Sequence, residues 1–262
     1  MRHDKILATE NNFFANGDAN GRGFHLGEIG ITNAKTGETF KVTKINAISG
    51  DQSFYYEDSK KEDKKRVMLH FTMGWLKGDL NRLTTPGDHV SVPFVISRSG
   101  KIVQLFGSVH WSYHLGKRAI GGNKTMSKSS IGIEISNIGP LVLVGDKLMT
   151  TYKTNGKFSD EYCRLGERDA YIKLEKKYRG YEYYASFTKE QIEITAKLVK
   201  FLAQKYDIPL NFIATPNRYE TLKTGAEATG YRGILSHVNV RTDKADIGPA
   251  FPWDKFIQLV KS

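Results

Sequence analysis

The fold is decided by a short apolar stretch, Arg66-Val67-Met68-Leu69-His70-Phe71-Thr72. A run of four to eight mostly apolar residues is typical of a buried strand, and here the strand brings the imidazole of His70 to its end. A second such run, SIGIEIS, covers residues 130–136 and contains Glu134. A carboxylate in so apolar a setting is paired, lies near a metal or has a shifted pKa.

A β-hairpin is predicted between these two runs. Its strands are residues 91–97 (SVPFVIS) and 101–106 (KIVQLF), and residues 98–100 form the turn. A helix is predicted from Thr188 to about Tyr206, because Thr188 and Gln191 fit a capping box and Pro209 follows. A shorter helix is expected from Pro252 to about Val260. Strands interleaved with helices predict an α/β fold with a mixed central β-sheet flanked by helices.

Residues 1–62 have a different character and predict a β-rich N-terminal extension, or small β appendage, of unassigned role. Within it, residues 31–42 (ITNAKTGETFKV) predict a hairpin with its turn at residues 35–37. The charge-rich residues 57–65 (EDSKKEDKK) are typical of a solvated linker. We therefore place a boundary there, with the main domain at residues 63–262. A long insertion from about Leu141 to Tyr184 is expected to shape a binding groove or simply to pack on the core.

The net charge of +11 implies attraction to polyanions, which include nucleic acid, anionic lipid and the anionic polymers of bacterial walls. No clustered basic and aromatic stripe is evident, so nucleic acid is not the expected partner. A single cysteine, Cys163, excludes an internal disulfide and a cysteine-rich zinc cluster. The first ten residues lack the apolar core of a secretory signal, and no run reaches membrane-spanning length. We therefore expect synthesis in the cytoplasm and no membrane insertion.

One irregular segment, residues 236–253 (SHVNVRTDKADIGPAFPW), carries His237, Lys244 and Asp246. Neutral imidazole and carboxylate are zinc ligands, and a catalytic zinc site leaves one position open for water. A single histidine with a nearby aspartate is also typical of an ordinary hydrogen-bonded surface pair. The segment alone leaves both interpretations open, because a zinc site needs at least one further ligand.

Several blocks together resemble a known family, the zinc-dependent N-acetylmuramoyl-L-alanine amidases of type 2. That family includes phage endolysins, muropeptide-recycling amidases and the related peptidoglycan recognition proteins. The resemblance spans roughly residues 64–262, which makes residues 63–262 the amidase catalytic domain. The blocks are residues 69–72 (LHFT), 91–96 (SVPFVI) with 100–104 (GKIVQ), 113–116 (YHLG), 130–134 (SIGIE), and 237–253.

The resemblance implies a Zn²⁺ cofactor held by His70, His237 and Asp246. Glu134 is then the residue that orients or deprotonates the zinc-activated water, and Lys244 stabilises the developing oxyanion. His114 matches a histidine that lines the substrate groove in the family. The implied reaction is hydrolysis of the amide between N-acetylmuramic acid and L-alanine in bacterial peptidoglycan.

Three functions remain open for such a chain. The expected one is a monomeric, phage-type endolysin that reaches the cell wall after release through a holin-type lesion. An intracellular muropeptide-recycling amidase is the second. The third is a non-catalytic peptidoglycan-binding protein on the same fold, although binding-only relatives usually lose a metal ligand and this chain keeps every matched position.

Overall fold

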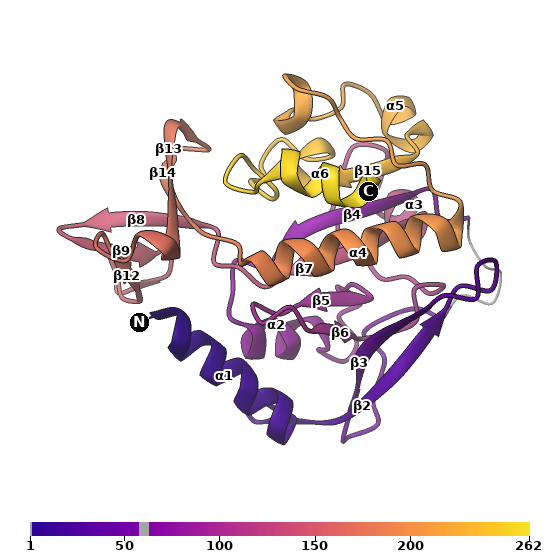
Figure 1. Ribbon diagram of the computed structural model, residues 1–262, viewed down its shortest axis with the longest axis horizontal. Helices are drawn as coiled ribbons and strands as arrows, with labels where there is room; N and C mark the ends of the chain where they lie inside the picture. The colour runs from indigo at the N-terminus through magenta and orange to yellow at the C-terminus, as the bar shows by residue number, and fades with distance from the viewer. Residues whose placement is uncertain (1, 58–62) are drawn as a thin grey trace.

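The computed structural model describes residues 2–57 and 63–262. Its centre is an eight-stranded mixed sheet (Figure 1). The four strands at one side, β5, β7, β4 and β15, run parallel to one another, whereas β2–β3 and β5–β6 are antiparallel pairs. This confirms the predicted mixed α/β fold. The spatial order is β1 (Asp18–Ala19), β2 (Arg22–Thr32), β3 (Thr39–Ala47), β6 (Ile102–Gln104), β5 (Phe94–Ile96), β7 (Ser130–Ile135), β4 (Arg66–Phe71) and β15 (Gly233–Ser236).

One face of the sheet is covered by α4 (Lys189–Tyr206) and α6 (Trp253–Lys261), and Figure 1 shows α4 crossing it. The capping box of α4 is present, with the Thr188 side chain accepting from the Gln191 amide. Alternate strand residues, such as Leu69 and Ile133, pack against this helix layer. Because successive side chains of a strand point to opposite faces, His70 and Glu134 face away from α4.

The opposite face is covered by α1 (Arg2–Asn16), α2 (Leu76–Leu83) and α3 (Asn123–Lys128). The first helix has no counterpart in the sequence prediction. Its Phe13 is fully buried in the core beneath the sheet. Its Glu10 carboxylate accepts the backbone N–H groups of Arg98 and Ser99, at 3.0 and 3.1 Å, in the β5–β6 turn. Glu10 thus ties the start of the chain to the central hairpin.

The N-terminal hairpin forms as predicted, with β2 and β3 paired from Thr32–Thr39 at the turn to Phe24–Ala47. Its second strand joins the central sheet through the parallel pairing of β3 with β6. The predicted linker and domain boundary fall largely on residues 58–62, which lie outside the described residues. The division at residue 62 therefore stays a prediction.

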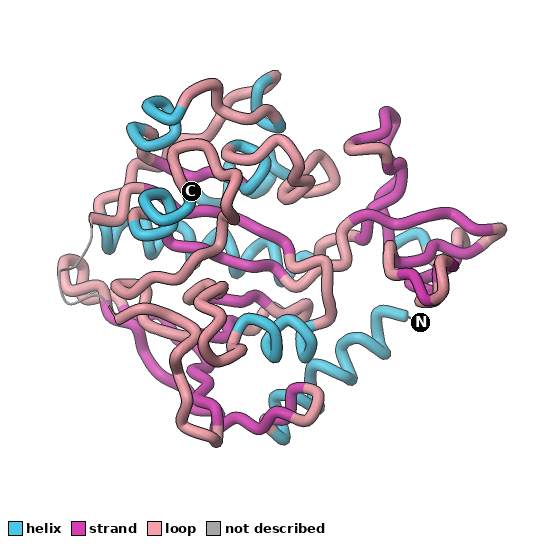
Figure 2. The backbone as a smooth tube through the Cα atoms, turned by 180° about the vertical axis from the view of Figure 1, so that it is seen from behind, coloured by secondary structure: helices cyan, strands magenta, loops and turns pink. Residues whose placement is uncertain are grey.

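The insertion forms a second, five-stranded sheet, here called the accessory sheet, which stands beside the central one (Figure 2). Its strand order is β12 (Glu161–Arg164), β9 (Lys147–Thr150), β8 (Pro140–Val144), β14 (Tyr181–Ala185) and β13 (Tyr171–Tyr178). A small hairpin, β10 (Lys153–Thr154) with β11 (Lys157–Phe158), extends from it. The accessory sheet shares a core with α1, because Ile6 packs among residues that include Leu148 and Tyr162.

The remaining regular elements are short. They comprise α5 (Gly225–Gly230) and the 3-10 turns η1 (Arg168–Ala170), η2 (Asn217–Tyr219) and η3 (His237–Asn239). No helix in the described part of the chain combines the length and apolar character needed to cross a membrane.

Candidate metal centre

Three neighbouring parallel strands place three of the predicted site residues at one end of the sheet. His70 on β4 is directly opposite Glu134 on β7. On the other side of β4, Ser236 of β15 is opposite Leu69, so His237 follows beside His70. The carboxyl ends of parallel strands are the usual place for binding sites in α/β sheets. Residues far apart in the sequence therefore meet at this end of the sheet.

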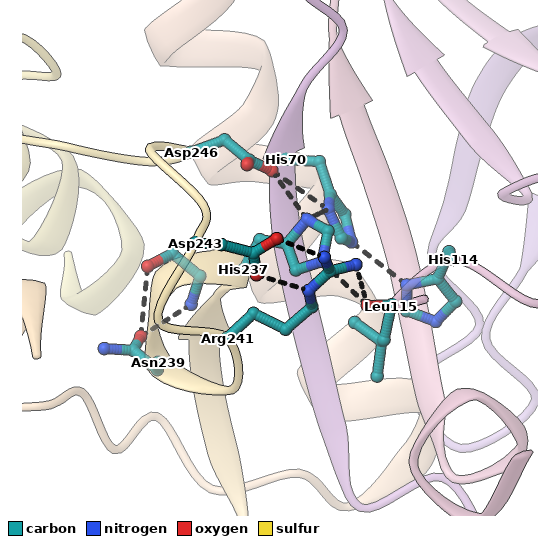
Figure 3. A network of polar contacts seen from close by, with 9 residues as sticks. His70, His114, Leu115, His237, Asn239, Arg241, Asp243 and Asp246 are labelled. Atoms are coloured by element: carbon teal, nitrogen blue, oxygen red, sulfur yellow. Dashed lines mark hydrogen bonds and ion pairs between the residues drawn. The ribbon is translucent and has the colours of Figure 1, made fainter. Parts of the chain in front are cut away.

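A tight triangle of donor atoms forms the centre of the site (Figure 3). His70 Nδ1 and His237 Nδ1 lie 3.0 Å apart, and Asp246 Oδ2 lies 3.2 Å from the first and 3.0 Å from the second. All three residues are buried, and they form a group able to hold a metal ion. Asp246 is brought there by its own backbone, since its carbonyl accepts the Val238 N–H at 2.8 Å.

The two imidazole rings explain why a cation fits inside the triangle. His237 Nε2 donates to the Leu115 carbonyl oxygen at 3.1 Å, which in a neutral imidazole leaves Nδ1 with a lone pair. That lone pair then faces the Asp246 carboxylate, an arrangement that is repulsive unless a positive charge lies between them. Burial lowers the pKa of His70 to about 4, with help from neighbouring His237, so His70 is neutral at pH 7.

The dimensions and chemistry of the triangle suit zinc. Nitrogen and oxygen ligands 2.0–2.1 Å from a tetrahedral zinc ion lie roughly 3.3 Å from one another. The three separations here, 3.0 to 3.2 Å, are close to that value. Two neutral imidazoles and one carboxylate are also a common ligand set of catalytic zinc sites. Ligation by these three residues stays a prediction that the geometry supports.

Glu134 is the unpaired carboxylate of the site. Its Oε2 is buried and has no hydrogen-bond partner among the described residues. Burial raises the pKa of Glu134 well above its ordinary value, the Asp246 and Asp79 charges raise it further, and Lys244 opposes them. Leaving a carboxylate unpaired in a buried position is costly, and such groups concentrate at functional sites.

The predicted His114 lies on the far side of His70. Its Nδ1 is 3.0 Å from His70 Nε2, and the two rings meet edge to face. His114 therefore contacts His70, a predicted metal ligand, at His70 Nε2, which is the ring nitrogen outside the triangle. Its predicted contact with substrate stays a prediction.

Residues 60–249 match the family model of N-acetylmuramoyl-L-alanine amidases, Amidase_2. The chain belongs to the N-acetylmuramoyl-L-alanine amidase family. The matched segment contains all six predicted site residues. No curated protein matches this chain.

Solved structures of amidases are similar to this chain at low identity. AmiD from E. coli, in complex with anhydro-N-acetylmuramic acid-L-Ala-D-gamma-Glu-L-Lys, is 20% identical over 78% of this chain, with a TM-score of 0.47. AmpD, as a selenomethionine derivative, is 19% identical over 80% of this chain and 92% of its own, with a TM-score of 0.43. The endolysin amidase LysCS from Clostridium intestinale is 12% identical over 77% of this chain and 86% of its own, with a TM-score of 0.39. The chain covers only 60% of the length of AmiD.

The loop after His114 supplies a contact that the sequence did not reveal. The Leu115 carbonyl accepts from His237 and also from Arg241 Nη1, at 3.1 Å in each case. The next residue, Gly116, has a φ of +75°, and a Cβ there would lie 2.1 Å from Arg241 Nη1. The positive φ favours glycine here, and a larger residue would also displace the Arg241 guanidinium. The YHLG block thus orients a predicted zinc ligand through a backbone oxygen.

A third carboxylate, Asp79 of α2, lies buried beneath the site and was also missed. Its Oδ2 accepts from the Ser136 hydroxyl at 2.9 Å. Burial raises the pKa of Asp79 to about 7. The backbone approaches it closely, because a Cβ on Gly74 would lie 1.9 Å from Asp79 Oδ1.

The Asp79→Asn variant is expected to change the pH dependence of stability. The folded state keeps a proton on Asp79 that the unfolded chain, with an ordinary pKa of 3.8, loses between about pH 4 and pH 7. Ionisable Asp79 therefore lowers stability as pH rises through that window, by on the order of 4 kcal/mol at most. The variant should gain stability relative to the parent between pH 4 and pH 8 in urea unfolding. Asp254→Asn, at a side chain 93% exposed, is the control; a parallel response of parent and Asp79→Asn would contradict the assignment.

Proposed function

We propose that this chain is a zinc-dependent hydrolase of the amide that joins N-acetylmuramic acid to L-alanine in peptidoglycan. The observation that carries the proposal is the buried triangle of His70, His237 and Asp246, with the unpaired Glu134 beside it, in a member of this amidase family. In this proposal the triangle would hold the zinc, whose Lewis acidity would polarise the amide carbonyl and lower the pKa of water.

Glu134 performs the proton transfers, and the groups around it position the imidazoles and stabilise the developing charge. Glu134, as a carboxylate, accepts a proton from the attacking water, and its raised pKa suits it to pass that proton to the leaving nitrogen of L-alanine. The Leu115 carbonyl and His114 hold the two imidazoles in place through their outer nitrogens. Lys244, half-buried on the same loop as Asp246, donates to the carbonyl oxygen as negative charge develops on it.

The Lys244→Met variant tests that last role. Methionine keeps much of the length of the side chain but removes its charge and its hydrogen-bond donors. Loss of one oxyanion donor typically lowers kcat about 10²–10³-fold, and we expect a fall of that size here with little change in zinc affinity. Initial rates of amide cleavage and chelator competition measure the two quantities. A kcat within a few-fold of the parent would remove Lys244 from the mechanism.

We further propose that the substrate is the polymeric wall, as for an endolysin, rather than a released muropeptide. The net charge of +11 supports binding to an anionic polymer. The segment that runs from Leu115 into α3 adds support, because it carries exposed Lys117, Arg118 and Lys124 near the His114 side of the site. A small muropeptide has too few charges to need such a surface.

Mass spectrometry of the products tests both proposals. The protein would be freed of metal and incubated, with and without added zinc, with purified peptidoglycan or with a soluble muropeptide. Zinc-dependent release of peptides with a free L-alanine amino group, faster from the polymer, is the expected result. Faster cleavage of the muropeptide would favour a recycling amidase. Retention on an intact polymer would instead indicate a binding protein.

A further inference from the structure

The accessory sheet reaches the loop that carries Lys244 and Asp246. The tip of its β13–β14 hairpin places the Tyr178 ring against Gly248, where an added Cβ would lie 2.4 Å from Tyr178 Cε1. The neighbouring Arg179 donates from Nη1 to the Thr242 carbonyl at 2.6 Å. These two contacts lie on either side of Lys244 and Asp246 in the sequence. The hairpin therefore contacts the predicted ligand loop on both sides of Lys244 and Asp246.

The hairpin tip is itself well fixed. Arg179 and Gly180 have φ values of +52° and +86°, as in the two-residue turns that match the twist of a β-hairpin, and Tyr178 pairs with Tyr181 across the turn. The Tyr184 hydroxyl donates to the Tyr178 carbonyl at 2.6 Å. The Tyr178 ring also meets the Tyr219 ring at 5.9 Å. The tip can therefore act as a rigid support.

A second contact joins the accessory sheet to the other side of the site. The Tyr152 hydroxyl, in the loop after β9, donates to the Met73 carbonyl. Met73 is three residues beyond His70 and has a φ of +54°, a conformation that few side chains adopt without support. One accessory sheet thus contacts the segment after His70 and the segment around Asp246.

We propose that the accessory sheet is a clamp on the metal centre, in which Tyr178 and Arg179 are positioning residues for Lys244 and Asp246. The inference rests on the proposed zinc-dependent function and adds to it a role for residues 140–185. Its physical basis is that a metal site needs ligands held within about half an ångström, whereas Asp246 lies on an irregular loop. Contacts behind metal ligands typically contribute 10- to 100-fold in metal affinity.

Zinc affinity, measured by competition with a chromophoric chelator, tests the clamp. Arg179→Ala and Tyr178→Ala are each expected to raise the zinc Kd about 10-fold or more. Lys177→Ala is the matched control, because Lys177 is an exposed cation on the same strand and should leave the Kd unchanged. Arg179 is exposed, so its replacement is compatible with folding. Unchanged zinc affinity in both variants would overturn the proposal, whatever their thermal stability.

A pair of substitutions tests the contact itself. Gly248→Ala introduces the Cβ that meets Tyr178 and should weaken zinc binding in the parent protein. In the Tyr178→Ala background the same change should have little further effect, because the opposing ring is gone. Additive effects would show that Gly248 and Tyr178 act separately and would contradict the clamp. Measurements on the parent protein distinguish failure of the proposed function from failure of the clamp. If the parent neither binds zinc nor cleaves peptidoglycan, the proposed function is wrong. If the parent does both and the variants behave like it, only the clamp is wrong.

Discussion

Glu134→Gln is expected to lower kcat about 10²–10⁴-fold while zinc affinity stays close to that of the parent. Glutamine has nearly the same shape as glutamate but cannot take a proton from water at neutral pH. Zinc affinity should be preserved because Glu134 lies beside the donor triangle and is not part of it. Initial rates on purified peptidoglycan and zinc titration measure the two effects in the same preparation.

Stability provides the control for Glu134→Gln. Because burial raises the pKa of Glu134 in the folded state, its ionisation costs stability at neutral and higher pH. The glutamine variant should therefore be at least as stable as the parent at pH 8. Glu175→Gln, at an exposed position of β13, should leave rate and stability unchanged. Full activity in the Glu134 variant with normal zinc content would exclude the residue as the proton carrier.

Asp246→Ala is expected to weaken zinc binding by more than about 100-fold, beyond the range typical of contacts behind the ligands. The aspartate is the only carboxylate in the donor triangle, and its removal leaves two neutral imidazoles to hold a divalent cation. Amide cleavage should fall to background at micromolar zinc. Metal analysis after gel filtration, combined with chelator competition, measures the loss.

The nearby Asp243 offers a matched control for Asp246. It lies three residues earlier on the same loop, pairs with Arg241 and Arg118, and has no atom in the triangle. Asp243→Ala removes the same charge and should retain stoichiometric zinc. If Asp246→Ala kept zinc at the affinity of the parent, the third ligand would have to be another residue. If both variants lost zinc equally, loop structure rather than ligation would explain the result.

The central elements could be predicted because their signals are local. The apolar runs around Leu69 and Ile133, and the capping box at Thr188, each specify an element within a few residues. The first helix was missed even though Ile6 and Phe13 lie on one face of it, because polar residues and Glu10 occupy the positions between them. Glu10 is buried only because the distant turn at residues 98–99 donates to it. Such a contact has no local pattern.

The site, too, was predictable only in part: its ligands could be predicted, but their supporting contacts could not. The resemblance supplied His70, His237 and Asp246, and the structure brings the three together. The supporting contacts could not be predicted, since they depend on how separate segments pack. The oxygen that orients His237 belongs to the backbone of Leu115, where the side chain carries no information about it. The meeting of Tyr178 with Gly248 depends on the placement of a whole accessory sheet.

The edge strands of the central sheet affect whether neighbouring molecules pair through their strands and aggregate. At one edge of the sheet the two-residue β1 covers only the start of β2, at residues 22–23, and at the other edge β15 has four residues. The open side of β15 is partly closed, because the Ile234 N–H donates to the Asn211 carbonyl and Phe212 forms a bridge with Ile234. Long open edges invite strand pairing between molecules and aggregation, whereas short and covered edges resist it. Molecules held close together should therefore not join through the β15 edge.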